Sequence, residues 1–169
     1  VAPIGDAYQL IELELAADVQ ELTVTLAFAH DRIQLAAYTL LDDERRLRAH
    51  LTIGRFMRES LVAGAPEAEQ LFATVNHLNL GASLMDDARE IDDLCRLNLA
   101  AGRQAKQSNA YPAALDYFQQ ALALPAEDVW QADYAFAMAL YTEAAEAADL
   151  SGAYDTMDDL LATGFAQAK

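Results

Sequence analysis

The strongest constraint on the fold is a pair of apolar helical patterns that flank a short break within residues 97–124. Leu97, Ala101 and Ala105 recur four residues apart in the first pattern. The second pattern forms one stripe at helical spacing, made of Ala114, Leu115, Phe118, Ala121 and Leu122. Pro112 follows the break, where it suits the first turn of a helix because its missing N–H needs no partner there. The stretch therefore predicts two antiparallel helices joined by a tight turn.

Small residues stand where two such helices approach each other. Gly102, Ala114 and Ala121 leave room that Phe118 can fill. These residues resemble the tetratricopeptide repeat, with Gly102 at the small position of the first helix and Ala114, Phe118 and Ala121 at the alanine, aromatic and alanine positions of the second. Asn98 stands where that repeat usually has an aromatic residue, and the closing proline comes one residue early. A well-packed helical hairpin outside that family is the alternative.

Apolar faces at helical spacing recur along most of the chain. The expected helices span residues 28–41, 43–60, 67–80, 86–107 and 127–150, with a last helix around residues 157–161. The hydrophobic fraction is 54%, and the few glycines and prolines fall mainly between these segments. Three stacked helical hairpins are the number that a repeat array generally needs for stability. The prediction is a mainly α fold in which hairpins stack as a tetratricopeptide-like superhelix.

The first thirty residues follow the strand period instead. Apolar residues alternate with polar or small ones over residues 11–15 and again over residues 22–28, and the second run is rich in β-branched residues. A small β-hairpin is the prediction, although the first run also fits a helix because its isoleucine and last leucine are four apart. We therefore divide the chain into residues 1–41, a β-hairpin plus helix, and residues 42–169, a helical repeat domain.

The charge of the chain is strongly negative and unevenly distributed. A formal net charge of −16 argues against binding to a nucleic acid. Six arginines gather in one region: Arg32, Arg45, Arg46, Arg48, Arg55 and Arg58. Beyond residue 104, two lysines stand against ten carboxylates. This asymmetry would orient the two halves toward different neighbours, and a solvated acidic face is the alternative explanation.

The sequence carries no segment that predicts a membrane or secretory location. There is no run of 18 apolar residues and no basic-then-apolar leader. The single Cys95 has no partner for a disulfide, and we expect it to be a buried thiol. We expect a cytoplasmic, soluble chain with no membrane partner.

No motif predicts a self-sufficient active site. The phosphate-binding GxxxxGK[ST] pattern, GxGxxG and GxSxG are all absent. His30, His50 and His77 share no metal-ligand spacing. Paired aspartates occur at residues 42–43, 86–87, 92–93 and 158–159. Most stand at expected helix starts, where a carboxylate accepts unsatisfied backbone N–H groups. We expect no catalysis and no metal or cofactor site in this chain.

His30 and Asp31 follow the second expected strand and open a helix that carries a tyrosine. The segment FAHDRIQLAAYTLL resembles the end of the winged-helix element in STAND-type signalling ATPases, although Ala29 replaces the usual methionine of Met-His-Asp. In that family the corresponding histidine approaches the β-phosphate of bound ADP. The resemblance thus implies nucleotide sensing by His30, with Asp31 orienting it or capping the helix. A neutral histidine satisfied within the fold is the alternative.

Three further segments extend this resemblance over the rest of the chain. They are HLTIGRFMRES, LFATVNHLNLGASL and LCRLNLAAGRQAKQSNAYPAALDYFQQAL. Their order and spacing are similar to those of the region after the ATPase module in large bacterial multidomain regulators, which carry serine/threonine kinase, sensor histidine kinase or transcription-factor modules. The resemblance implies a non-catalytic regulatory segment. An upstream module would hold the ATP or ADP, and this segment would couple its state to partner or effector output.

The expected partner is a protein, a peptide or another domain of the same polypeptide. Asn98, Arg103 and Gln104 are the candidate contacts, because the first helix of such a repeat commonly faces the ligand. Two alternatives remain open from the sequence. One is a free-standing adaptor that never meets nucleotide, and the other is an enzyme with an unrecognised site.

Overall fold

The computed structural model describes residues 38–61, 68–124 and 129–167. The predicted β-hairpin, together with His30 and Asp31, lies outside these residues. The chain divides into two compact units, residues 1–46 and 47–169, and each is considered by itself. The predicted domain boundary after residue 41 stays a prediction.

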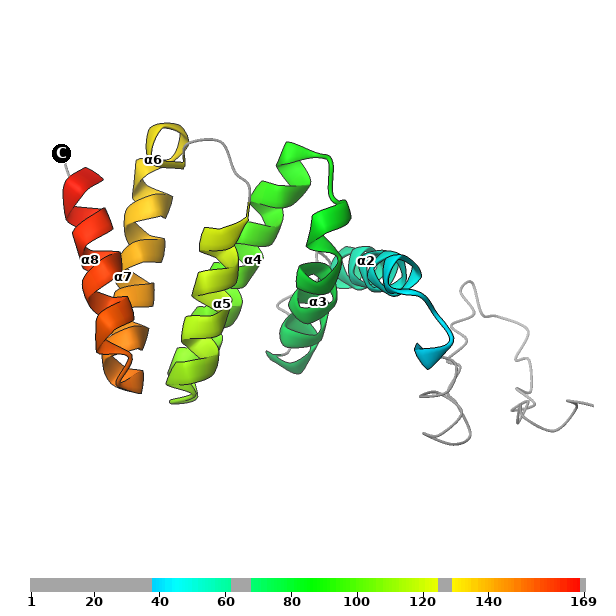
Figure 1. Cartoon of the computed structure of the whole chain (residues 1–169), viewed down its shortest axis with the longest axis horizontal. Helices are drawn as coiled ribbons and strands as arrows, with labels where there is room; N and C mark the ends of the chain where they lie inside the picture. The colour runs from blue at the N-terminus through cyan, green and yellow to red at the C-terminus, as the bar shows by residue number, and fades with distance from the viewer. Residues whose placement is uncertain (1–37, 62–67, 125–128, 168–169) are drawn as a thin grey trace, which may run out of the picture. The chain divides into compact units, whose positions relative to one another are not determined.

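All regular secondary structure in the described residues is helical (Figure 1). The α-helices are α2 (Asp43–Leu61), α3 (Ala68–Gly81), α4 (Ala88–Gln107), α5 (Tyr111–Ala123), α6 (Val129–Ala132), α7 (Tyr134–Ser151) and α8 (Tyr154–Gln167). A short 3-10 helix, η1 (Ala82–Leu84), follows α3 directly. The prediction of a mainly α fold is confirmed. None of the helices described here is long and apolar enough to cross a membrane.

Aspartate side chains begin several of these helices. Asp42 accepts a hydrogen bond from the backbone N–H of Arg45 at 2.8 Å, and Asp87 accepts one from Arg89 at 2.9 Å. These two aspartates therefore act as the predicted caps. The other two predicted pairs, residues 92–93 and 158–159, lie inside α4 and α8 and start no helix.

A third aspartate cap corrects the predicted helix over residues 127–150. The Asp133 carboxylate accepts a hydrogen bond from the backbone N–H of Phe136 at 3.0 Å, and α7 begins at Tyr134. The short α6 ends one residue before Asp133. The predicted single helix is therefore interrupted, because the Asp133 side chain satisfies an N–H group that opens a new helix.

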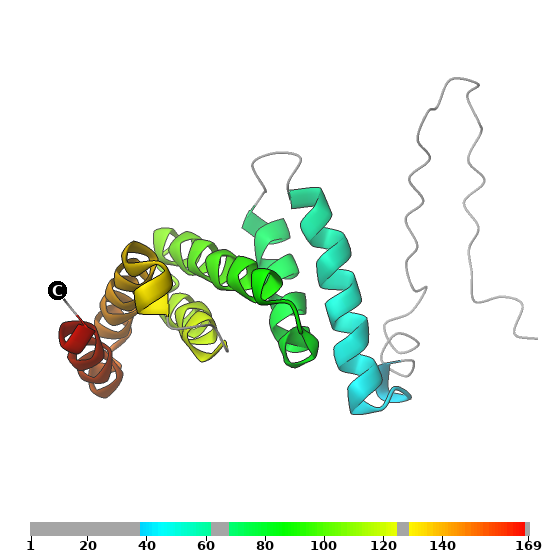
Figure 2. The ribbon, with the colours of Figure 1, turned by 90° about the horizontal axis from the view of Figure 1, so that it is seen from above.

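Helices of the second unit pack in succession along the chain. Helix α3 packs on α4, α4 on α5, α5 on α7 and α7 on α8 (Figures 1 and 2). Tight turns join α4 to α5 and α7 to α8, so each pair runs antiparallel. Asn109 and Gly152 supply the left-handed conformation in these turns, with φ of 59° and 79°. The hairpin predicted for residues 97–124 is thus present, and the helices predicted over residues 127–150 and around residues 157–161 form a second one through α7 and α8.

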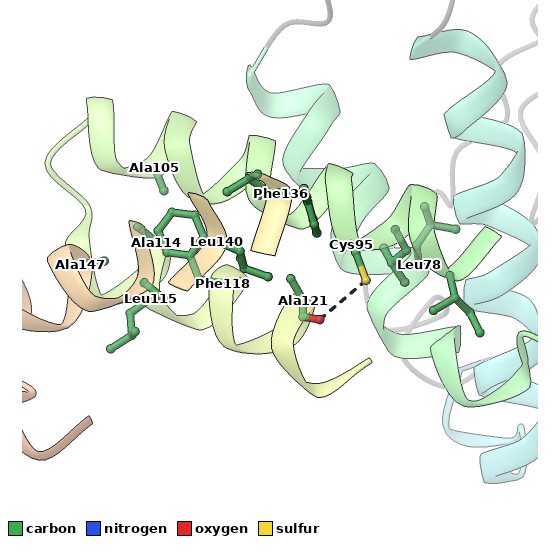
Figure 3. Close-up of a cluster of buried hydrophobic side chains, with 14 of the residues drawn as sticks. Leu78, Cys95, Ala105, Ala114, Leu115, Phe118, Ala121, Phe136, Leu140 and Ala147 are labelled. Carbon is green, nitrogen blue, oxygen red and sulfur yellow. Dashed lines mark hydrogen bonds between the residues drawn. The ribbon is translucent and has the colours of Figure 1, made fainter. Parts of the chain in front are cut away.

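A continuous apolar core runs between these helices, with α5 at its centre (Figure 3). Phe118 is fully buried and lies against Gly102 of α4. A Cβ atom added at Gly102 would lie 2.6 Å from Cδ1 of Phe118, closer than atoms can approach without a shift. The predicted pairing of a glycine with an aromatic ring therefore holds α4 and α5 together.

Two further glycines allow α2 and α3 to approach each other. A Cβ atom at Gly54 of α2 would lie 2.7 Å from Cδ2 of Leu78. A Cβ atom at Gly81 of α3 would lie 2.6 Å from Cβ of Leu51. Both leucines are buried, so these contacts bring α2 onto the same core.

Candidate protein-interaction surface

Asn98, one of the three predicted partner-binding residues, lies inside the helix stack. Its side chain has 0% exposure. The Nδ2 group donates to Oδ1 of Asn79 at 2.8 Å and to the backbone oxygen of Leu94 at 3.0 Å, while Oδ1 accepts from Nδ2 of Asn79 at 2.9 Å. The placement of Asn98 on an open surface was therefore wrong. Both amide hydrogens and the side-chain oxygen of Asn98 are already hydrogen-bonded. The two bonds with Asn79 connect α4 to α3.

Arg103 and Gln104 lie further along α4. Arg103 is 47% exposed and donates through Nε to Glu143 at 3.0 Å. Gln104 is half-buried. Partner binding by these two residues stays a prediction. The structure adds that Arg103 already has an ion-pair partner on α7.

Glu143 is the centre of an ion-pair network between α4 and α7. Lys106 Nζ lies 2.5 Å from Glu143 and 2.8 Å from Glu146. Burial would raise the pKa of Glu143, but the hydrogen bonds from Lys106 and Arg103 hold that pKa below its ordinary value. Burial likewise opposes the charge on Lys106, yet its two carboxylate partners raise its pKa. These contacts therefore favour the charged forms of Glu143 and Lys106.

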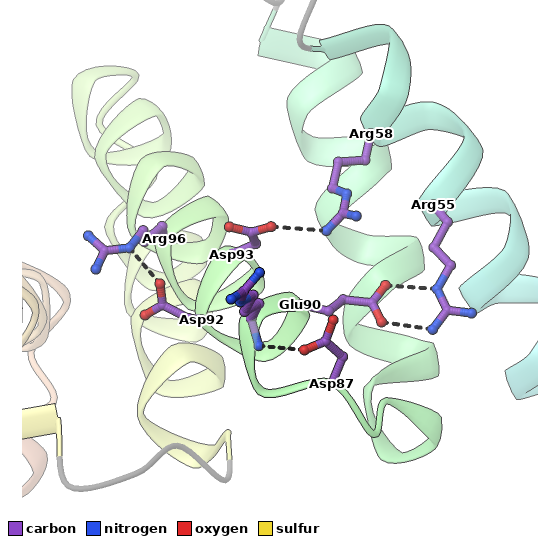
Figure 4. A network of polar contacts seen from close by, with 8 residues as sticks. Arg55, Arg58, Asp87, Glu90, Asp92, Asp93 and Arg96 are labelled. Atoms are coloured by element: carbon purple, nitrogen blue, oxygen red, sulfur yellow. Dashed lines mark hydrogen bonds and ion pairs between the residues drawn. The ribbon is translucent and has the colours of Figure 1, made fainter. Parts of the chain in front are cut away.

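The arginine-rich segment is partly used within the chain (Figure 4). Arg55 of α2 forms two hydrogen bonds of 2.7 Å with the carboxylate of Glu90 on α4, and Arg58 pairs with Asp93 at 3.3 Å. The hydrogen bonds from Arg55 lower the pKa of Glu90. Two of the six clustered arginines are thus structural links between α2 and α4.

His50, His77 and Cys95 are the remaining candidate chemical groups in the described residues. His50 and His77 place their Nδ1 atoms 2.8 Å apart, so one ring donates and the other accepts. Burial, and then the charge of His50, lowers the pKa of His77. Burial also raises the pKa of the Cys95 thiol to about 11. Within the described part of the chain, no three His, Cys, Asp or Glu residues are arranged to hold a metal ion.

A groove between α3 and α5 was not predicted. It has a volume of about 360 Å³ and is lined by Asn76, Asn79, Leu80, Ala113, Asp116, Tyr117 and Gln120. The lining residues recur three and four apart on each helix, so each wall is one helical face. That spacing was visible in the sequence. The sequence could not show that these faces of α3 and α5 meet, because α4 separates the two helices along the chain.

Comparison with known proteins finds a similarity to a signalling protein. The chain is 31% identical, over an alignment of 166 positions, to a segment of hybrid signal transduction histidine kinase G from Dictyostelium discoideum. The alignment covers 84% of this chain but only 5% of that protein. No protein-family model matches the chain. No solved structure gives a significant match.

Proposed function

We propose that this chain is a non-catalytic regulatory and protein-interaction segment of a STAND-type ATPase signalling protein. The observation that carries the proposal is the similarity to a short segment of a hybrid signal transduction histidine kinase. A segment of this size within a signalling protein fits a part that links an input module to an output. The segment would then couple the input module to the output and would not catalyse a reaction itself.

The helix stack supports such a role physically. Each hairpin packs on the next through buried side chains, and ion pairs such as Arg103–Glu143 bridge α4 and α7. A tetratricopeptide-like arrangement would present long helical faces to a partner while the buried core keeps them in register. The pairing of Gly102 with Phe118 at the repeat-like positions supports that assignment.

The more specific part of the proposal is that His30 and Asp31 couple bound nucleotide to the helical segment. An upstream ATPase module of the same polypeptide would present ADP to His30, and α2 would follow that site in the chain. A neutral or protonated imidazole can contact phosphate near neutral pH. Loss of this contact on nucleotide exchange would then release the helical segment toward its partner or effector.

The proposal is tested first by the size of the natural polypeptide. An immunoblot of the source cells should show a band several times larger than the 18.4 kDa of this chain. In that parent protein, His30→Ala should accelerate ADP release at pH 7.5, whereas the matched control His77→Gln should not. A natural band at the size of this chain would overturn the switch proposal.

A free-standing adaptor for a protein or peptide is the second candidate function. The observation that favours it is the groove between α3 and α5, whose lining residues all lie within the described part of the chain. A small natural polypeptide that captures a partner with and without ADP would support the adaptor.

A further inference from the structure

The groove between α3 and α5 has one rigid end. The Tyr117 hydroxyl donates to Oδ1 of Asn76 at 3.0 Å, and the Tyr117 ring stacks on Phe72 with centroids 5.6 Å apart. Both contacts cross from α5 to α3. The two walls of the groove are therefore fixed relative to each other before any ligand binds.

A second residue of the α3 wall, Asn79, is also held in place. Asn79 exchanges two hydrogen bonds with the buried Asn98, so its side chain cannot rotate freely. Asn98 thus acts as a positioning residue for a group that lines the groove. Because these side chains are already ordered, less conformational entropy is lost when a ligand binds.

Several polar groups in the groove have unused bonding capacity. Asn76 accepts from Tyr117 through Oδ1, and its Nδ2 group has no partner in the described parts of the chain. Across residues 38–61, 68–124 and 129–167, the side chains of Asp116 and Gln120 also have no hydrogen-bond or ion-pair partner, and both residues are exposed. Leu80 adds an apolar surface with 51% exposure.

These groups match the chemistry of an extended peptide. A side-chain carboxamide offers a donor and an acceptor, as a peptide unit does, and therefore pairs well with backbone groups. The exposed Asp116 carboxylate would attract a cationic group of a ligand, and no residue that lines the groove is basic. A phosphate-bearing ligand is disfavoured because Asp116 would repel it.

We infer that the α3/α5 groove binds an extended peptide whose lysine or arginine side chain pairs with Asp116. Asn76 and Gln120 hydrogen-bond the peptide backbone, and Leu80 with the Tyr117 ring covers an apolar side chain beside the cation. The inference rests on the proposed interaction function and gives it a surface different from the predicted one at Arg103 and Gln104.

The probe for a test is a phage-displayed library of random dodecapeptides selected on the whole chain. Enriched sequences should contain a lysine or arginine at a recurring position. Synthesised with a fluorescent label, such a peptide should bind at least about fivefold more weakly to Asp116→Asn, as expected for loss of a charge-assisted contact. Gln120→Ala should also weaken binding. The matched control is Asp158→Asn, which removes an exposed carboxylate on α8 and should leave the affinity unchanged.

Three results would overturn the inference. One is a selection that yields no basic peptide, and another is equal affinity for the wild type and Asp116→Asn. The third is a dimer that forms with rising concentration and is lost in Asp116→Asn, because the groove would then hold a second copy of the chain. Far-UV circular dichroism of each variant checks that the fold is intact.

The same experiment separates this inference from the proposed function. If binding is insensitive to Asp116→Asn but is lost in Arg103→Ala, the groove assignment fails while the interaction function stands. If the parent protein signals normally after the helical segment is replaced by an unrelated helical linker, the proposed function fails whatever the groove binds.

Discussion

Asn79 and Asn98 exchange two side-chain hydrogen bonds, of 2.9 and 2.8 Å, between α3 and α4. Asn98 is fully buried, whereas Asn79 also lines the α3/α5 groove. The pair therefore connects the interior of the helix stack to a surface on which a partner could bind. A buried amide that keeps all its partners fixes the register of the helices that carry it.

Replacement of Asn98 by alanine should destabilise the chain and leave the Asn79 amide without its partner. We expect the free energy of unfolding to fall by about 1–3 kcal/mol, because a buried hydrogen-bonding group loses its bonds. Urea unfolding followed by circular dichroism measures the change. Asn79→Ala and the double variant complete a mutant cycle. Strictly additive effects would contradict a direct coupling between the two residues.

Gly102→Ala and Gly164→Ala should change stability in opposite directions. At Gly102 the new methyl group would lie 2.7 Å from Cζ of the buried Phe118, so the two helices would have to move apart. We expect a loss of about 1–3 kcal/mol from overpacking. At Gly164 of α8 no atom lies within 4 Å of the added Cβ, and alanine should stabilise the helix by about 0.5–1 kcal/mol. Parallel thermal and urea unfolding of the two variants measures both signs.

The Arg55–Glu90 pair should contribute to stability above acid pH. The pKa of Glu90 lies below its ordinary value of 4.5 in the folded chain, chiefly because Arg55 donates to it. The folded state therefore binds this proton less readily than the unfolded state does. The contribution is present above pH 4.5 and is lost as the pH falls through the lowered pKa.

The variant Arg55→Met tests this contribution. We expect the fall in unfolding free energy between about pH 5 and pH 3 to become shallower, since Glu90 then has no donor to keep it ionised. Arg89→Met is the matched control, because Arg89 is exposed on α4 and its side chain has no partner in the described residues. Identical pH profiles for the wild type and Arg55→Met would contradict the role of the pair.

Cys95 should react slowly with alkylating reagents while the chain is folded. Its thiol is 4% exposed, and burial raises its pKa to about 11 from an ordinary value of 9.0. At pH 8 the thiolate fraction should therefore be about 100-fold below that of an ordinary thiol. Mass spectrometry after iodoacetamide treatment measures the rate, since the chain has a single cysteine. Treatment in urea should restore fast alkylation, and fast reaction without urea would show that the site opens.

The parts of the fold that the sequence predicted are those that depend on local spacing. Gly102 and Phe118 face each other across a tight turn, so a helical period and a turn were enough to pair them. The interruption at Asp133 was missed because the apolar period continues past it, whereas one carboxylate cap decides where α7 begins. The groove was missed for a different reason. It depends on which faces of α3 and α5 meet, and residues near in sequence do not determine that contact.

For Asn98, the sequence indicated an unusual position but not the environment of the side chain. Its position, where the resembled repeat usually has an aromatic residue, marked it as unusual in the sequence, and the structure confirms an unusual environment. A polar residue at a helix position was interpreted as a surface contact. The hydrogen bonds with the Asn79 side chain that make the buried Asn98 acceptable could be seen only once α3 and α4 were placed side by side.

The His50–His77 pair should make the free energy of unfolding depend on pH. The pH range of this effect should be higher than that of the Arg55–Glu90 pair. The two Nδ1 atoms lie 2.8 Å apart, so a hydrogen bond requires one of them to be unprotonated. Burial, followed by the charge of His50, lowers the pKa of His77 below its ordinary value of 6.5. The unfolded state therefore binds the His77 proton more readily than the folded state. The contribution is present above pH 6.5 and is lost as the pH falls through the lowered pKa.

Substitution of His77 by glutamine tests this dependence, because glutamine can still bond to His50 but does not titrate. For the wild type, the free energy of unfolding should decrease as the pH is lowered from 7 to 5, and for His77→Gln the decrease should be smaller. Urea unfolding at half-unit pH steps measures both profiles. A parallel fall in the two chains would show that other groups cause the loss. A steeper fall in His77→Gln would reverse the sign of the coupling and overturn the assignment of a depressed histidine pKa.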